Sequence, residues 1–106
     1  MSTVSPYHAI ADPTRRAILD LLRDQGTCTT GTIATHFATL SRPAISKHLK
    51  VLREAELVRA QERGREWHYT LDPEPLRAVE GWIARYEPFW QRTLETLKHF
   101  VESAEK

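Results

Sequence analysis

Side chains that donate hydrogen bonds are concentrated between residues 41 and 58. The polar positions there hold short hydroxyls and cations, with no carboxylate before Glu54: Ser41, Arg42, Ser46, Lys47, His48 and Lys50. Such groups donate to phosphate oxygens and to base edges in nucleic acids. A solvated helix face would use similar residues, but the absence of anions over ten positions favours contact with double-stranded DNA.

The roles within this set differ by position. We expect Arg42, Ser46, Lys47 and His48 to face base edges, and Ser41 and Lys50 to hold phosphates. Pro43 suits the first turn of a helix, where its missing N–H is not needed, and we include it in the predicted DNA-contacting set.

The element that must position these side chains is a helix. Ile45, Leu49 and Leu52 recur at helical spacing and form one apolar stripe that needs a partner. Ser41 suits the N-cap, and the pattern predicts one helix over residues 41–58.

Shorter helices are predicted upstream of it. The first covers residues 7–11. The second has Asp12 as its N-cap and Pro13 at its first position, and it ends near Gly26. The third is capped by Thr29 or Thr30 and lasts about two turns. Residues 38–40 then form a tight connection, which gives a helix-turn-helix arrangement.

The period changes to two after Val58. Residues 59–63 and 66–71 are predicted to be strands of a hairpin, a wing, in which Trp67, Tyr69 and Leu71 share the half-buried face. Arg63 and Arg65 flank Gly64 at its tip. They either contact an adjacent minor groove or its phosphates, or form a charged turn that is merely solvated.

The tail after residue 72 carries a long apolar stripe with several aromatic residues. Pro88 predicts a kink or a break around residues 85–87. So much apolar surface exceeds what a small core can cover, and a symmetric homodimer would bury it. The predicted dimer interface comprises Tyr7, Trp82, Ile83, Tyr86, Phe89, Trp90, Leu94 and Leu97. The alternative is a ligand pocket between terminal helices, lined by Trp82, Tyr86, Phe89 and Trp90.

Length and charge agree with one small domain. The 106 residues carry a net charge of +1, but residues 42–71 hold seven cations against four anions, a local +3. We expect a single domain over 1–106, with a DNA-binding core at 7–72, its wing at about 58–71 and a dimerisation segment at 73–103. The fold class is mainly α with a small β-hairpin. Without an apolar run of about 20 residues or a signal peptide, we expect a cytoplasmic protein that does not enter a membrane.

Three segments resemble the ArsR family of bacterial winged helix-turn-helix repressors. They are AIADPTRRAILDLL, TIATHFATLSRPAISKHLKVLREAELV and ERGREWHYTL, within residues 7–72. The resemblance implies a dimer held by terminal helices that binds a palindromic operator and represses transcription, often of its own operon.

The metal sites of that family are not matched. Its usual cysteine pair would align with Thr29 and Gly31, whereas Cys28 is one position away, and the terminal helix carries only His99. One residue rotates a helical side chain by about 100°. The chain therefore resembles the branch without metal sites, and we expect no metal and no cofactor; an inducer remains unidentified.

Other functions are weaker alternatives. Cys28 could make the chain a redox-responsive regulator, although no cation adjoins it. The winged helix could instead be a protein-interaction or dimerisation module without DNA binding. No phosphate loop, nucleophile elbow or ligand cluster favours an enzyme. Near the start of the second helix, Arg15 and Arg16 are expected to pair with a carboxylate rather than with phosphate.

Overall fold

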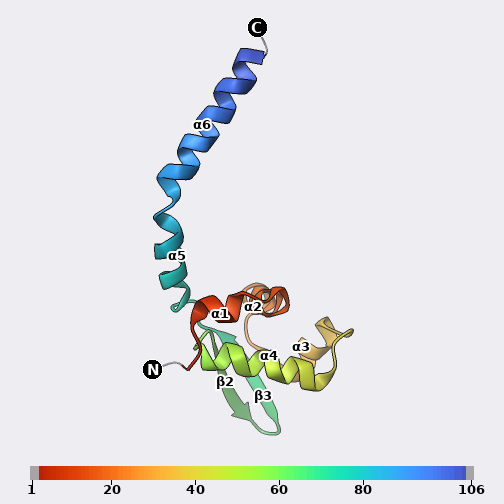
Figure 1. Cartoon of the computed structure of the whole chain (residues 1–106). Helices are drawn as coiled ribbons and strands as arrows, with labels where there is room; N and C mark the ends of the chain where they lie inside the picture. The colour runs from red at the N-terminus through yellow and green to blue at the C-terminus, as the bar shows by residue number, and fades with distance from the viewer. Residues whose placement is uncertain (1–2, 105–106) are drawn as a thin grey trace.

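A helical body and a small antiparallel sheet form one end of the molecule, and two helices extend from it in series (Figure 1). The computed structural model describes residues 3–104. The elements in chain order are α1 (Pro6–Ile10), α2 (Pro13–Gln25), β1 (Cys28–Thr29), α3 (Thr30–His36), α4 (Arg42–Glu54), β2 (Val58–Arg63), β3 (Glu66–Leu71), α5 (Leu76–Ala84) and α6 (Glu87–Ala104). None of the helices in this described range is long and apolar enough to span a membrane.

Side-chain caps start the helices of the body where the sequence predicts. The Asp12 carboxylate accepts from the backbone N–H of Arg15 at the start of α2, and Pro13 occupies the first turn. The Thr29 hydroxyl caps α3 in the same way. Gly26 follows α2 with a φ of 79°, a conformation that favours glycine. These three helix boundaries confirm the sequence prediction.

The helix α4 starts as predicted, with Ser41 as its N-cap, but it ends at Glu54 rather than at residue 58. Glu56 adopts a φ of 62°, and its N–H bonds to the carbonyl of Arg53 at 2.9 Å. The N–H of Leu57 bonds to the carbonyl of Leu52 at 3.0 Å. These two bonds form a Schellman motif, which stops the helix. Helical spacing of apolar residues could not reveal this stop, because Leu57 is itself buried.

The sheet has three strands in the order β1-β3-β2, all antiparallel. The hairpin β2–β3 confirms the predicted wing, and its two-residue turn places Gly64 first, with a φ of 64°. The short strand β1 was not predicted; Cys28 pairs with Tyr69 in it. On the face predicted to be half-buried, Tyr69 is 9% exposed and Trp67 is 42% exposed, because Trp67 lies beyond β1, near the tip.

The apolar stripe of α4 lies in the core of the body. Ile45, Leu49 and Leu52 are each at most 2% exposed, and they cluster with Ile18, Leu22 and Ile33 from α2 and α3, among others. The opposite side of α4 therefore faces solvent, and the core fixes its orientation.

The tail is broken rather than kinked. At its break the N–H groups of Arg85 and Tyr86 bond three residues back, to Trp82 and Ile83, and Pro88 has no N–H to continue the α-helical series. The helix α6 buries no residue. It extends beyond α5, away from the body, in Figure 1.

Candidate nucleic-acid interface

The exposed side of α4 holds most of the predicted DNA contacts. We call it the reading face, and it comprises Ser41, Arg42, Pro43, Ser46, Lys47 and Lys50, all of which are exposed. The side chain of Lys50 is 68% exposed, and its Nζ lies 3.9 Å from Glu54 Oε1. Such a solvated pair is weak, so a phosphate could replace the carboxylate as the partner of Lys50.

His48 lies differently from the other predicted contacts. Its side chain is 21% exposed and turns toward the start of α2. Its Nδ1 lies 3.5 Å from Arg15 Nη1 and 4.0 Å from Asp12 Oδ2. Contact of His48 with base edges stays a prediction, since most of the imidazole is covered by the protein.

The expectation that Arg15 and Arg16 pair with a carboxylate is wrong. Arg15 donates to the carbonyls of His8 and Ala9, at 3.0 and 2.7 Å, and Arg16 Nη1 donates to the carbonyl of Ile10 at 2.7 Å. These carbonyls lie at the end of α1, and that of His8 also accepts from the N–H of the C-cap Ala11 at 3.2 Å. Both arginines therefore connect α2 to α1.

The carboxyl of Asp12, at the start of α2, interacts electrostatically with His48 on α4. Its pKa is lowered, first because it accepts from the backbone N–H of Arg15, and then by the charges of Arg15 and of His48 when the imidazole is protonated. Partial burial opposes this shift. The sequence shows Asp12 as an N-cap, but its proximity to His48, 36 positions away, depends on the packing of α2 against α4.

The wing tip approaches the start of α4. Arg63 and Arg65 are exposed, and Arg63 donates to Gln61 Oε1 at 3.3 Å. Arg65 and Arg42 both line one surface groove of about 400 Å³, together with Thr29, Thr30, Gly31, Glu66 and Trp67. The fold thus brings a wing cation and a reading-face cation to the same groove, although 23 positions separate them.

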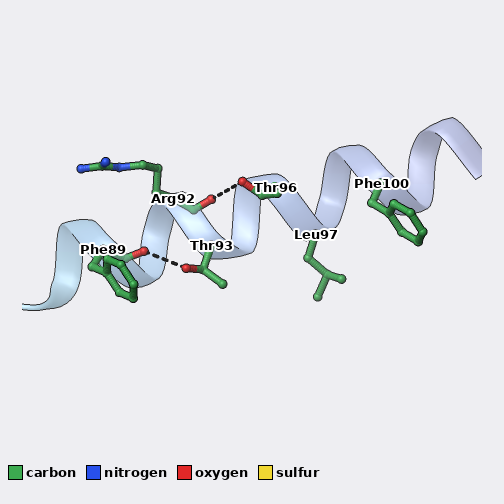
Figure 2. Close-up of a pocket in the computed structure, with 6 residues that line it drawn as sticks. All are labelled: Phe89, Arg92, Thr93, Thr96, Leu97 and Phe100. Atoms are coloured by element: carbon green, nitrogen blue, oxygen red, sulfur yellow. Dashed lines mark hydrogen bonds between the residues drawn. The ribbon is translucent and has the colours of Figure 1, made fainter.

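The residues predicted for the dimer interface remain exposed in the single chain. Their exposed fractions run from 38% at Ile83 to 62% at Phe89. Tyr7 donates its hydroxyl to the carbonyl of Ala78 at 2.9 Å and packs edge-on against Trp82, so α1 contacts α5 within one chain. The hollow along α6 in Figure 2 is lined by residues of that single helix, Phe89, Arg92, Thr93, Thr96, Leu97 and Phe100.

Cys28 is 4% exposed, and burial raises the pKa of its thiol. Its Sγ lies 3.5 Å from the carbonyl oxygen of Gly26, as a weak donor. Because thiolate is the reactive form, this environment disfavours the redox alternative. Within residues 3–104, no three His, Cys, Asp or Glu side chains gather closely enough to hold a metal ion.

Comparison with known proteins places this geometry among transcriptional regulators. A helix-turn-helix domain family matches residues 10–61. The transcriptional repressor SdpR of Bacillus subtilis is 41% identical over 80 residues, which cover 76% of this chain and 87% of SdpR. The regulator Rv2034 of Mycobacterium tuberculosis is 39% identical over 97 residues, covering 92% and 86%.

Solved structures give the same result for the fold. The structure of an ArsR-like transcriptional regulator from Rhodococcus sp. RHA1 is similar with a TM-score of 0.68 and 33% identity, covering 92% of this chain and 87% of that one. Another ArsR family regulator matches with a TM-score of 0.70 and 34% identity, covering 80% and 86%.

Proposed function

The chain belongs to the ArsR family of winged helix-turn-helix, DNA-binding transcriptional regulators, and from this premise we propose that it acts as a homodimeric repressor of a palindromic operator. Each subunit places the reading face of α4 in the major groove, with half-site centres about 34 Å apart. Repression follows because the bound dimer blocks access to the promoter. We propose that the promoter of its own operon is among those repressed.

The observation that carries this proposal is the division of α4 into two sides. Ile45, Leu49 and Leu52 hold one side in the core, while the hydroxyls and cations of the reading face stay in solvent. A helix held in this way can enter a groove without losing its packing. We assign Arg42, Ser46 and Lys47, with His48 at the edge, to base contacts, and Ser41 and Lys50 to phosphates.

The wing and the tail complete the proposed assembly. Arg63 and Arg65 extend the contact to the neighbouring minor groove or its phosphates. The tail, residues 73–103, dimerises through its exposed apolar residues together with Tyr7, while residues 7–72 form the DNA-binding core of a single domain. We further propose a cytoplasmic location. We also propose that the chain has no catalytic activity, because DNA binding accounts for the residues singled out above.

Selection of bound duplexes from a random pool, followed by salt titrations, tests the function. Lys50→Ala should weaken binding to every sequence and lower the salt slope by about one per subunit, since one phosphate contact is lost. Arg42→Ala should relax the preference at one position of each half-site. Lys98→Ala, on the distant α6, is the matched control and should leave both quantities unchanged.

The outcomes separate the parts of the proposal. If no sequence is enriched and affinity at low salt is the same for all duplexes, the repressor assignment fails and a protein-interaction role gains support. If Arg42→Ala and Lys50→Ala lose affinity equally for cognate and random duplexes, the assigned division between base and phosphate contacts is wrong.

A further inference from the structure

The guanidinium of Arg15 contacts two helices besides its own. Its Nε and Nη2 donate to the carbonyls of Ala9 and His8, at the end of α1, and its Nη1 lies 3.5 Å from Nδ1 of His48 on α4. A guanidinium is planar, stays charged and can only donate. The two backbone bonds fix its plane, and this plane holds the third nitrogen against the imidazole.

This contact constrains where the proton of a neutral His48 lies. Nδ1 can interact favourably with a donor only through its lone pair, so the ring proton belongs on Nε2. Asp12 Oδ2, at 4.0 Å from the same atom, favours the opposite tautomer. Arg15 lies closer, and the Asp12 carboxylate already accepts from the backbone N–H of Arg15 at 3.0 Å.

Resting on the DNA-binding function proposed above, we propose that Arg15 is a positioning residue that holds His48 as an Nε2–H donor toward an acceptor on the operator. The side chain of His48 is 21% exposed, and the proposal requires that Nε2 belongs to this exposed part. Phosphate oxygens offer only acceptors, as do N7 and O6 of guanine on its major-groove edge. In the opposite tautomer Nε2 would present a lone pair to the same atoms, and the contact would be repulsive.

The tautomer can be measured without DNA. Long-range proton–nitrogen correlation spectra of the ring-labelled protein in alkaline buffer distinguish a protonated Nε2 from a protonated Nδ1. We expect His48 to be protonated at Nε2 in the wild type. Arg15→Lys keeps a cation near the α1 carbonyls but replaces the fork by a single ammonium, so protonation should shift toward Nδ1. A solely structural role for Arg15 would leave the tautomer unchanged.

A pair of amide variants tests the donor against the operator selected as above. The amide nitrogen of His48→Gln reaches the position of Nε2, whereas that of His48→Asn reaches only the position of Nδ1. We expect His48→Gln to bind within about threefold of wild type and His48→Asn to lose about tenfold per subunit, the effect of one hydrogen bond to a charged or strong acceptor.

Modified operator DNA can identify the group that accepts the hydrogen bond from His48. Replacing single phosphates by uncharged methylphosphonates should abolish the difference between the two variants at one site if the acceptor is a phosphate. Base substitutions should abolish it if the acceptor is guanine. A wild-type His48 protonated at Nδ1, or equal losses for the two variants, would overturn the proposal. If no duplex is bound, the repressor function fails, while the spectrum still decides the tautomer.

Discussion

Within residues 3–104, six of the eleven large apolar side chains that are exposed lie on α6, which therefore offers a quantitative test of the proposed dimer. Leu94 and Leu97 are 61% and 57% exposed, and α6 buries no residue in the single chain. Leu94→Ser with Leu97→Ser should therefore remove apolar contacts of the proposed interface without creating a cavity inside one subunit. The body should keep its own stability, because its core does not include α6.

The magnitude follows from the exposed fractions. Full burial of a leucine contributes about 1.5–3 kcal/mol, so burial of the remaining three-fifths contributes about 1–2 kcal/mol. A symmetric dimer contains four such side chains, which together contribute about 4–7 kcal/mol. Since about 1.4 kcal/mol corresponds to a tenfold change, the dimer dissociation constant should rise by about 10³- to 10⁵-fold.

Sedimentation equilibrium over a range of concentrations measures this change. Glu95→Ser with Lys98→Ser, on the polar side of the same turns, is the matched control and should leave the constant near the wild-type value. A Leu94 and Leu97 double variant that dimerises within about tenfold of wild type would refute the assignment of α6 to the interface. A wild-type chain that stays monomeric at micromolar concentration would refute the dimer itself.

Three further predictions concern the body. Glu56→Gly should raise the free energy of unfolding by about 0.5–1 kcal/mol in urea titrations, since glycine adopts the positive φ at the end of α4 without strain; an unchanged or lower value would contradict this. Asp12 has a folded pKa below its ordinary value of 3.8, so its charge stabilises the fold above that pH and this contribution is lost as the pH falls through the lower, folded pKa. Melting curves of Asp12→Asn, which keeps a capping oxygen without the charge, should therefore vary less with pH below 3.8 than those of wild type, and parallel curves would show that the carboxylate contributes nothing. Cys28 should react with thiol reagents only as fast as the body opens, with a rate that rises in subdenaturing urea; rapid labelling of the native protein would restore the redox alternative.

Local chemistry made several elements predictable. Ser41 and Pro43 determine the start of α4 through capping and a missing N–H, both of which act within one turn. Pro88 determines the break of the tail for the same local reason. Alternation and a turn glycine are sufficient for the wing. In each case the determining residues lie within a few positions of the feature, so the local sequence is sufficient to predict it.

Features that depend on distant partners could not be predicted. The strand β1 forms because Cys28 lies beside Tyr69, 41 positions later, and two residues carry no recognisable strand pattern. The partners of Arg15 and Arg16 are backbone carbonyls, and every sequence offers backbone carbonyls at every position. Exposure of Trp67 depends on where the short β1 ends. The packing of segments that are distant in sequence determines each of these features, and the spacing of residues along the chain does not reveal that packing.

A short series of contacts connects the tail to the reading face. Tyr7 ties α1 to α5 through the carbonyl of Ala78, at 2.9 Å. Arg15 ties the other end of α1 to His48 on α4. The five-residue helix α1 is therefore bonded both to α5 and, through Arg15, to α2 and the edge of α4. If the tails pair as proposed, a change in their pairing should reach α4 through Tyr7 and Arg15. The evidence for this path would be a His48 tautomer that changes in Tyr7→Phe, which removes only the hydroxyl, and an unchanged tautomer would contradict it.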